Sequence, residues 1–277
     1  MSVELQNYPQ AGIYDELLDA ELQPRPAARA LFDYVNRLGS VELSARRASV
    51  DAAIMAMGIT FTVYSDAGNI DRAWPFDIIP RTLSSTEWAR IDAGLKQRLT
   101  ALNLFIDDLY NGQKVVRDGV FPLEVLAGSK NFRVQCKGMS PRFGVWAHIC
   151  GTDLVRDGDG TMYVLEDNLR VPSGVSYMLE NRKMMMRLLP ELFAAQSVRP
   201  VQHYPDVLLD NLRGLAPEHV EPTVAVLTPG PWNSAYFEHA FLAQQMGVEL
   251  VEGQDLFVRD DTVYMKTTKG PKRVHVI

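Results

Sequence analysis

Two acidic residues flank a glycine-rich turn in the part of the sequence best suited to chemistry, residues 151–174. Asp153 precedes the turn, Glu166 follows it, and residues 157–160 between them are Asp-Gly-Asp-Gly. Asp-Gly pairs are typical of tight turns between antiparallel strands. Folding the chain about the middle of this turn places Asp153 opposite Glu166. The sequence therefore predicts a hairpin that pairs two carboxylates.

Alternation of side chains between the two faces of a strand predicts what else shares this surface. Asn168 and Arg170 follow Glu166 at intervals of two, so a regular strand presents all three on the face of Asp153. The same symmetry pairs two valines on this face, Val155 and Val164. The other face then carries residues suited to a core: Leu154, Tyr163 and Leu165.

This set of side chains suits magnesium and a triphosphate. Magnesium takes hard oxygen ligands, usually one or two carboxylates together with substrate phosphates. Asp153 would hold one ion, Glu166 would bridge two, and Asn168 would complete the second without adding charge. The planar guanidinium of Arg170 matches phosphate oxygens, so we expect it to pair with the triphosphate and to take part in its chemistry.

A helix predicted to begin just after the hairpin offers a place for an anion. Residues 171–174 are Val-Pro-Ser-Gly, and the helix expected over 175–189 follows them, closed by Pro190. Free backbone N–H groups at a helix N-terminus attract anions, so Ser173 and Gly174 are expected to contact phosphate. Ser173 as a simple helix cap is the alternative, and both roles are compatible.

Two other interpretations of the acidic hairpin stay open. An Asp-Gly-Asp-Gly turn flanked by acids is commonly a solvated hairpin without a ligand. Alternatively, Asp153 and Glu166 could act as the acid and base of a hydrolase, which would need no ATP. That interpretation leaves Asn168 and Arg170 without a role.

A long helix and an irregular N-terminal region are expected to position the hairpin. The helix spans residues 87–110: its apolar residues recur every three or four positions, Ser84 and Glu87 have capping-box spacing, and Asn111-Gly112 ends it. Residues 145–168 are expected to be β-structure. Earlier elements are expected in this order: an irregular segment (1–25), two helices (27–38 and 43–57) ended by Gly39 and Gly58, and a strand (59–64).

The pattern changes in the last third of the chain. Pro-containing, polar residues 198–222 suggest a boundary between a first domain, 1–200, and a second, 201–277. The second begins as a doubly wound β-α-β unit, with strands over 223–227 and 248–251 around a helix over 235–246. The loop 228–234 could line an acceptor-substrate pocket or be purely structural. We expect a hairpin over 256–265, turning at 260–261, and a last strand that ends in mid-element, as in a truncated chain.

Composition excludes several classes of protein. The 277 residues carry a net charge of −6, with 47% hydrophobic and 22% charged residues, typical of a globular chain without a nucleic-acid or anionic-membrane surface. Two isolated cysteines, Cys136 and Cys150, argue against a zinc site or a disulfide framework. Neither a signal peptide nor a run long enough to span a membrane is evident, so we expect a cytoplasmic protein.

The motif and its surroundings resemble one family. Asp153 followed by E-x-N and Arg170 is similar to the metal motif of ATP-grasp enzymes. Four longer stretches resemble the circularly permuted ATP-grasp proteins of type 2, which have been described as glutathionylspermidine-synthase-like: AHICGTDLVRDGDG…YVLEDNLRVPSGVSYMLENR, PFDIIPRTLSSTEW, LKQRLTALNLFIDDLY and AVLTPGPWNSAYFEHAFLA. The similarity covers most of residues 30–277.

This resemblance implies a permuted α/β ATP-grasp fold with the metal-binding part first and the β-α-β unit second. It implies an ATP- and magnesium-dependent ligase that joins a small-molecule or peptide carboxylate to an amine through an acyl phosphate. It also implies a longer protein, whose remainder supplies the lysines that clamp ATP. The alternative is a non-catalytic nucleotide-binding or partner-binding protein on the same fold.

Overall fold

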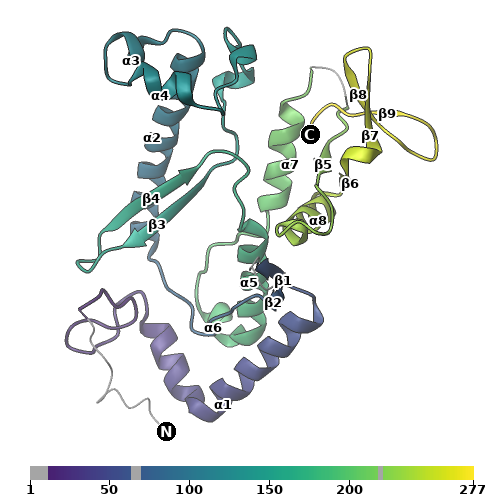
Figure 1. The fold of residues 1–277 in the computed structure, drawn as a ribbon. Helices are drawn as coiled ribbons and strands as arrows, with labels where there is room; N and C mark the ends of the chain where they lie inside the picture. The colour runs from purple at the N-terminus through teal and green to yellow at the C-terminus, as the bar shows by residue number, and fades with distance from the viewer. Residues whose placement is uncertain (1–11, 64–69, 218–220) are drawn as a thin grey trace. The chain divides into compact units, whose positions relative to one another are not determined.

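Separate segments of the chain assemble into two units in the computed structural model, which describes residues 12–63, 70–217 and 221–277 (Figure 1). In the described part of the chain, the first unit contains Leu17–Arg81 and Ser173–Ile277. The second contains residues 12–16 and Thr82–Pro172. The expected boundary at 198–222 differs from this division, because helix α7 (Tyr204–Gly214) lies there and buries Leu208 and Leu209. Residues 1–11 of the expected N-terminal irregular segment lie outside the described residues.

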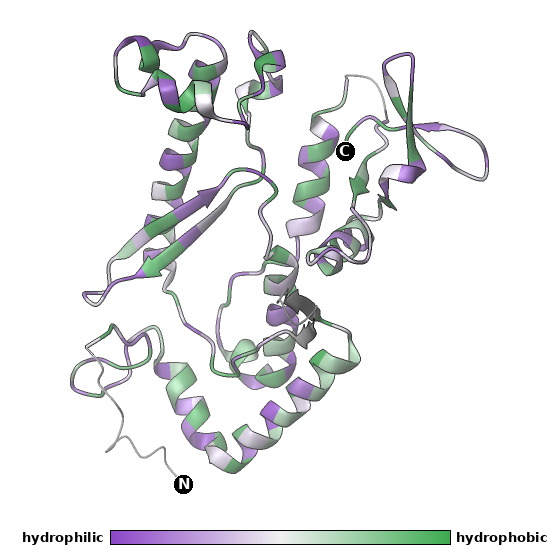
Figure 2. Cartoon of the chain, viewed as in Figure 1, coloured by the Kyte–Doolittle hydropathy of each residue, from purple (hydrophilic) through white to green (hydrophobic). Residues whose placement is uncertain are grey.

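The second unit is built on one long helix and one hairpin. Its elements in chain order are α2 (Ser85–Tyr110), α3 (Lys114–Arg117), α4 (Leu123–Gly128), the 3₁₀ turns η2 (Val134–Cys136) and η3 (Arg142–Gly144), and strands β3 (Gly151–Arg156) and β4 (Met162–Asn168). Figure 2 shows hydrophilic and hydrophobic residues alternating along α2. None of the residues of α2 is fully buried, so its apolar stripe is only partly covered.

The ends of α2 follow the sequence signals. Ser84 Oγ accepts a hydrogen bond from the Glu87 backbone N–H at 3.1 Å, and Asn111 is the C-terminal cap. The reciprocal half of the predicted capping box is replaced by another contact, because the Glu87 carboxylate pairs with Arg156 at 2.6 Å. A residue expected only to cap a helix therefore also holds the hairpin.

Residues 145–150 form a loop, and the prediction of a strand there is wrong. The backbone N–H groups of Trp146 and Ala147 both donate to Asn103 Oδ1, at 2.8 and 2.9 Å. The Trp146 ring stacks on Tyr110 at 4.7 Å, and its indole N–H donates to Asp107. Side chains of α2 thus satisfy the backbone groups that a neighbouring strand would have bonded.

The first unit begins with a broken helix. Helix α1 (Arg29–Ala56) contains the two expected helices, interrupted at Gly39, where φ is 73° and ψ is 170°. Strands β1 (Thr60–Val63) and β2 (Ile70–Ala73) follow as an antiparallel pair. Helices α5 (Val175–Leu188) and α6 (Pro190–Ala195) complete this part. The core between them is made of buried residues: Leu31, Tyr34, Val35, Val50, Ile54, Ile59, Ile78, Tyr177, Met185, Leu188 and Leu189.

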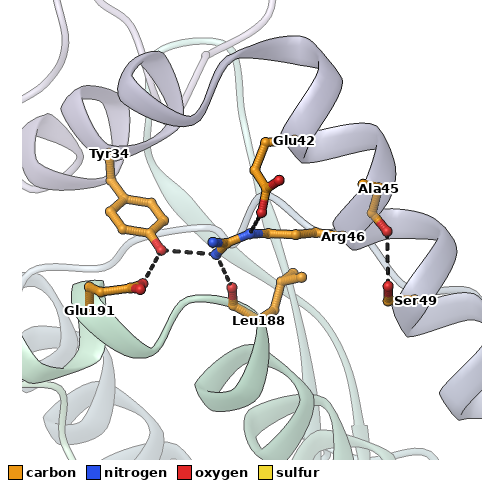
Figure 3. A network of polar contacts seen from close by, with 7 residues as sticks. All are labelled: Tyr34, Glu42, Ala45, Arg46, Ser49, Leu188 and Glu191. Atoms are coloured by element: carbon orange, nitrogen blue, oxygen red, sulfur yellow. Dashed lines mark hydrogen bonds and ion pairs between the residues drawn. The ribbon is translucent and has the colours of Figure 1, made fainter.

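A polar network fastens the two halves of α1 to the end of α5 and to α6 (Figure 3). Arg46 donates to the hydroxyl of Tyr34 at 2.9 Å, to Glu42 at 2.8 Å and to the Leu188 carbonyl. Tyr34 in turn donates to Glu191. This hydrogen bond holds the pKa of Glu191 below its usual range, whereas burial and the same contact raise the pKa of Tyr34.

The predicted β-α-β unit forms, with parallel strands β5 (Ala225–Leu227) and β6 (Glu249–Val251) around α8 (Tyr236–Met246). Gly247 ends α8 with φ of 67°, as expected. After the 3₁₀ turn η4 (Gly253–Asp255), the chain forms an antiparallel sheet of β7 (Leu256–Arg259), β8 (Thr262–Met265) and β9 (Lys272–Arg273). The predicted turn at residues 260–261 is present. Within the described residues, no helix has the length and apolar character needed to cross a membrane.

Candidate metal and nucleotide site

The acidic hairpin has the predicted pairing at the end that carries the candidate metal ligands. Asp153 lies directly opposite Glu166, and Gly151 lies opposite Asn168. Residues paired across antiparallel strands point to the same face. The structure therefore brings Asp153, Glu166 and Asn168 to one surface.

A β-bulge changes the register beyond this pair. Between Asp153 and Leu154 the pairing shifts by one residue, so that Val155 lies opposite Tyr163 and not, as predicted, opposite Val164. Leu165 is the extra residue. The expectation that Tyr163 and Leu165 face a core is also wrong, since their exposed fractions are 52% and 72%. A hairpin's symmetry predicts pairing only where neither strand carries an extra residue.

The opposite face of the hairpin binds α2. Thr152 Oγ1 donates to Asp167 at 2.9 Å, and Arg98 of α2 pairs with the other Asp167 oxygen at 2.6 Å. The Asp167 side chain is only 7% exposed. Adjacent residues of β4 therefore face opposite ways. Asp167 is bonded within the unit, whereas Glu166 and Asn168 lie on the face away from α2.

Arg156 anchors the turn end of the hairpin, on the face away from Asp153, because side chains alternate along β3. Its guanidinium pairs with Glu16 at 2.9 Å and with Glu87 at 2.6 Å, and it donates to the Gly160 carbonyl. It also lies 4.9 Å from the centre of the Tyr14 ring. With 7% of its side chain exposed, Arg156 positions the hairpin and is not available to a ligand.

The exposed face has the chemistry of a cation site. Asp153 and Glu166 are both exposed, and Asn168 Nδ2 donates to Glu166 Oε1 at 3.0 Å. Like charges placed directly opposite one another destabilise a strand pair, so a bound cation would relieve a cost that the fold creates here. Among the described residues, this hairpin included, no group of three or more His, Cys, Asp and Glu side chains is placed to hold a metal ion, so the amide of Asn168 has to serve as the third ligand here. Two carboxylates and an amide oxygen fit magnesium, which completes its shell with water and phosphate.

Arg170 is not placed on this face by the strand. Strand β4 ends at Asn168, so the alternation that predicted the position of Arg170 does not extend to it. The residue is exposed in a bend, and Val171 after it has a positive φ of 48°. Strand geometry therefore does not bring Arg170 to the face of the carboxylates, and its role there stays a prediction.

The predicted anion site at the start of α5 holds a carboxylate of the same chain. The Gly174 N–H donates to both oxygens of Glu238 at 2.7 Å, and the Ser176 N–H donates to one of them at 3.2 Å. Glu238 lies in the first turn of α8 and is 5% exposed. The anion at this helix N-terminus is thus the Glu238 carboxylate, which occupies the Gly174 N–H, while Ser173 is exposed; binding of phosphate by Ser173 and Gly174 stays a prediction.

Sequence reasoning missed Glu238. An acidic residue in a first helical turn is ordinary, because it stabilises its own helix. Only the tertiary contact between α8 and α5 reveals its second role. The charge of Glu238 also affects two tyrosines. Burial, and to a lesser extent this charge, raise the pKa of Tyr177 to about 12, and the same two causes raise the pKa of Tyr204.

Comparison with known families decides the affiliation of this fold. The family model described as circularly permuted ATP-grasp type 2 matches residues 80–277, which include the acidic hairpin and the β-α-β unit. The chain belongs to this family. The resemblance noted from the motif is thereby confirmed, and the mixed helices and strands of this ATP-grasp chain are those of an α/β protein.

Relatives of this ATP-grasp chain are longer proteins. An uncharacterized protein of Synechocystis is 50% identical over 99% of this chain and 57% of its own length. An uncharacterized protein of Mycobacterium tuberculosis is 46% identical over 95% of this chain and 47% of its own length. A Frankia alni protein, 42% identical over 99% of this chain and 32% of its own length, is named "Putative glutamate--cysteine ligase 2-3". The chain thus spans about half the length of the first two.

Proposed function

We propose that this chain carries the metal-binding part of an ATP-dependent carboxylate–amine ligase. One observation carries the proposal: Asp153 and Glu166 are paired directly across the hairpin on its exposed face, with Asn168 bonded to Glu166. Membership of the ATP-grasp family supports ATP as the co-substrate. The name of the Frankia relative, "Putative glutamate--cysteine ligase 2-3", supports the ligase class.

Each proposed residue has a separate role. Asp153, Glu166 and Asn168 would hold magnesium, and Arg170 would pair with phosphate oxygens of ATP. When bound there, magnesium ions supply the positive charge that phosphoryl transfer requires. Ser173 would contact a nucleotide phosphate through its hydroxyl. Gly174 could join it only after Glu238 had released the N-terminus of α5.

The proposed reaction needs no covalent bond to the protein. A substrate carboxylate oxygen attacks the γ-phosphorus of ATP, which gives an acyl phosphate and ADP. An amine then attacks the acyl carbon, an amide bond forms, and phosphate leaves while the amine proton passes to solvent. The chain's own contribution is to position the triphosphate through a rigid hairpin, which Arg156 and Asp167 hold against α2.

We further propose that the chain is the first part of a longer, permuted ATP-grasp protein. The metal hairpin precedes the β-α-β unit in this sequence, and the relatives extend well beyond the matched region. The remaining part would supply the cations that clamp the nucleotide. This order of parts follows from the family and not from the arrangement of the two units.

Turnover of the full-length protein tests the ligase proposal. ADP release is measured with magnesium and ATP while carboxylic acids and amines are supplied in pairs, beginning with glutamate and cysteine. We expect ADP release that requires both substrates and that is lost in Glu166→Ala. Magnesium-dependent ATP binding without turnover on any pair would support the non-catalytic alternative. Hydrolysis without ATP would instead support the paired-carboxylate hydrolase.

A further inference from the structure

The C-terminal end of α2 carries a cluster of positive charge that the acidic hairpin does not use. Residues 111–146, here called the basic tip, contain six Lys or Arg residues and two acidic residues, and the stretch 129–146 contains four cations and no acid. The net charge of the whole chain is −6, so its average composition conceals this local excess. The basic tip belongs to one unit, and Figure 1 shows its helices α3 and α4 beside the end of α2.

The basic tip is anchored to the end of α2. The Tyr110 ring stacks on Phe132 at 4.8 Å and on Trp146 at 4.7 Å. The Tyr110 hydroxyl accepts a hydrogen bond from the Arg133 N–H at 3.1 Å, and the Tyr110 carbonyl accepts one from the Gly138 N–H at 3.1 Å. Segments on both sides of the turns η2 and η3 are therefore fixed at the last residue of α2, which gathers the side chains of the tip in one place.

Three cations of this stretch keep their charge unneutralised. Lys130, Arg133 and Lys137 are exposed, and none of them forms an ion pair with a carboxylate in the described part of the chain. Lys137 Nζ lies 5.6 Å from the centre of the Phe132 ring, a contact that orients the side chain without cancelling its charge. This positive charge is therefore open to an anionic partner.

Large apolar side chains are exposed among these cations. Val134, in η2, is 64% exposed, and Met139 is also exposed, with its carbonyl bonded to the Asn111 amide at 3.2 Å. Phe143, in η3, is 67% exposed, and the Arg142 guanidinium lies 5.2 Å from the centre of its ring. The preceding segment adds three further exposed apolar side chains: Val120, Leu123 and Val125. Cations and apolar side chains thus share one anchored surface.

The backbone of Phe143 gives an independent indication that this surface has a role. Its φ of 61° and ψ of 7° place a bulky aromatic residue in the left-handed region, which is unfavourable for such a side chain. Backbone strain of this kind clusters at ligand-binding and switch regions. Most of the ring is exposed, so packing within the unit offsets little of the strain.

We propose that the basic tip binds an anionic lipid surface. Lys and Arg side chains are attracted to negatively charged headgroups, and aliphatic and aromatic side chains enter the apolar boundary beneath those headgroups. A nucleic acid would attract the same cations, but its phosphates offer nothing to exposed aliphatic side chains such as Val134 and Leu123. A bilayer supplies both contacts at once. The proposal does not depend on the ligase function.

Flotation of the full-length protein with lipid vesicles tests the proposal, without ATP or magnesium. The vesicles contain phosphatidylcholine with or without phosphatidylserine. We expect binding only where phosphatidylserine is present, and weaker binding as salt is added, because salt screens exposed charges. Equal binding to both kinds of vesicle would overturn the proposal. Binding to neither would also overturn it, and would mean that another part of the protein or a partner covers the tip. Binding of single-stranded RNA in preference to vesicles would overturn it in favour of a nucleic-acid surface.

A charge variant tests the contribution of the cations. The double substitution Arg133→Gln and Lys137→Gln should weaken vesicle binding by roughly tenfold or more. The matched control is Lys269→Gln with Lys272→Gln, which removes the same charge from exposed positions of the other unit and should change binding by less than about twofold. Equal losses in the two double variants would show that binding follows net charge alone and would overturn the proposal.

An apolar variant tests the contribution of the ring. Phe143→Asn keeps a residue that tolerates the left-handed backbone, and it should weaken vesicle binding about three- to tenfold. Val258→Asn is the control, since Val258 is equally exposed (68%) but lies on β7 of the other unit. Unchanged binding in Phe143→Asn would contradict insertion of the tip into the lipid surface.

Discussion

At the scale of single residues, two adjacent carboxylates in β4 have opposite roles. Glu166 is exposed and faces Asp153, whereas Asp167 is 7% exposed and bonded to Thr152 and Arg98. Without metal, Glu166→Gln should raise the free energy of unfolding by roughly 0.2–1 kcal/mol, because it removes a like-charge pair. Asp167→Asn should lower it by about 1–3 kcal/mol, because a satisfied internal carboxylate is lost.

Urea denaturation in the presence of a chelator measures both changes. We expect the two variants to shift the free energy of unfolding in opposite directions. A loss of stability in Glu166→Gln as large as that in Asp167→Asn would show that Glu166 is a structural residue and not a ligand.

The contact between Glu238 and α5 leads to a prediction about alkaline pH. Burial and then the charge of Glu238 raise the pKa of Tyr177 to about 12. In the unfolded chain a tyrosine loses its proton near pH 10, so between about pH 10 and 12 the unfolded state binds fewer protons. The stability that the raised pKa of Tyr177 contributes is therefore fully present below pH 10 and is lost as the pH rises towards 12.

Tyr177→Phe keeps the ring, which stacks on Trp74 at 4.0 Å, but has no proton to lose. Its free energy of unfolding should fall less steeply than that of the wild type across this range. Glu238→Gln should make the decline smaller without abolishing it. If the free energy of unfolding of Tyr177→Phe and of the wild type fell equally steeply with pH, Tyr177 would not be the group that loses its proton.

At the scale of elements, the break in α1 distinguishes two glycines that look alike in sequence. Gly39 has φ of 73° and ψ of 170°, a combination essentially confined to glycine, whereas Gly94 lies inside α2 with no atom within 4 Å of an added side-chain carbon. Gly39→Ala should therefore destabilise the protein by about 1–3 kcal/mol. Gly94→Ala should stabilise it by roughly 0.5–1 kcal/mol. Thermal or chemical unfolding of both variants checks the contrast, and a stabilising Gly39→Ala would mean that α1 is continuous.

The anchoring of the hairpin also belongs to this scale. Arg156→Ala removes the guanidinium that pairs with Glu16 and Glu87, so we expect the free energy of unfolding to fall by about 3–5 kcal/mol and hydrogen exchange across β3 and β4 to become faster. Lys96→Ala removes an ion pair whose lysine is 75% exposed and should change stability by less than about 0.5 kcal/mol. Similar effects of the two substitutions would contradict the anchoring role of Arg156.

Local signals in the sequence predicted most helices and strands, and they predicted the pairing of the hairpin on one side of its bulge. The pairing of Asp153 with Glu166 followed from the position of the turn, and the stops at Asn111 and Gly247 followed from helix-capping preferences. The bulge at Leu165 had no signal in the local sequence. The same is true of Glu238, whose partner lies in a different helix.

At the scale of the whole molecule, the division into units could not be predicted from composition. Residues 198–222 contain prolines and polar residues typical of a linker, but helix α7 there packs through Leu208 and Leu209 into the first unit. Contacts between segments distant in sequence determine the unit boundaries. The family match, in contrast, was anticipated because the metal motif is local and specific.

The central claim is that the exposed face of the hairpin holds the metal ions of an ATP site. Isothermal titration calorimetry of ATP into the full-length protein, with and without magnesium, tests it most directly in three forms: wild type, Glu166→Ala, and Asp159→Asn as an acidic control in the turn of the same hairpin. We predict that binding requires magnesium, persists in Asp159→Asn and weakens at least about tenfold in Glu166→Ala, a change of about 1.4 kcal/mol or more. Equal binding in all three forms, or binding that ignores magnesium, would contradict the claim.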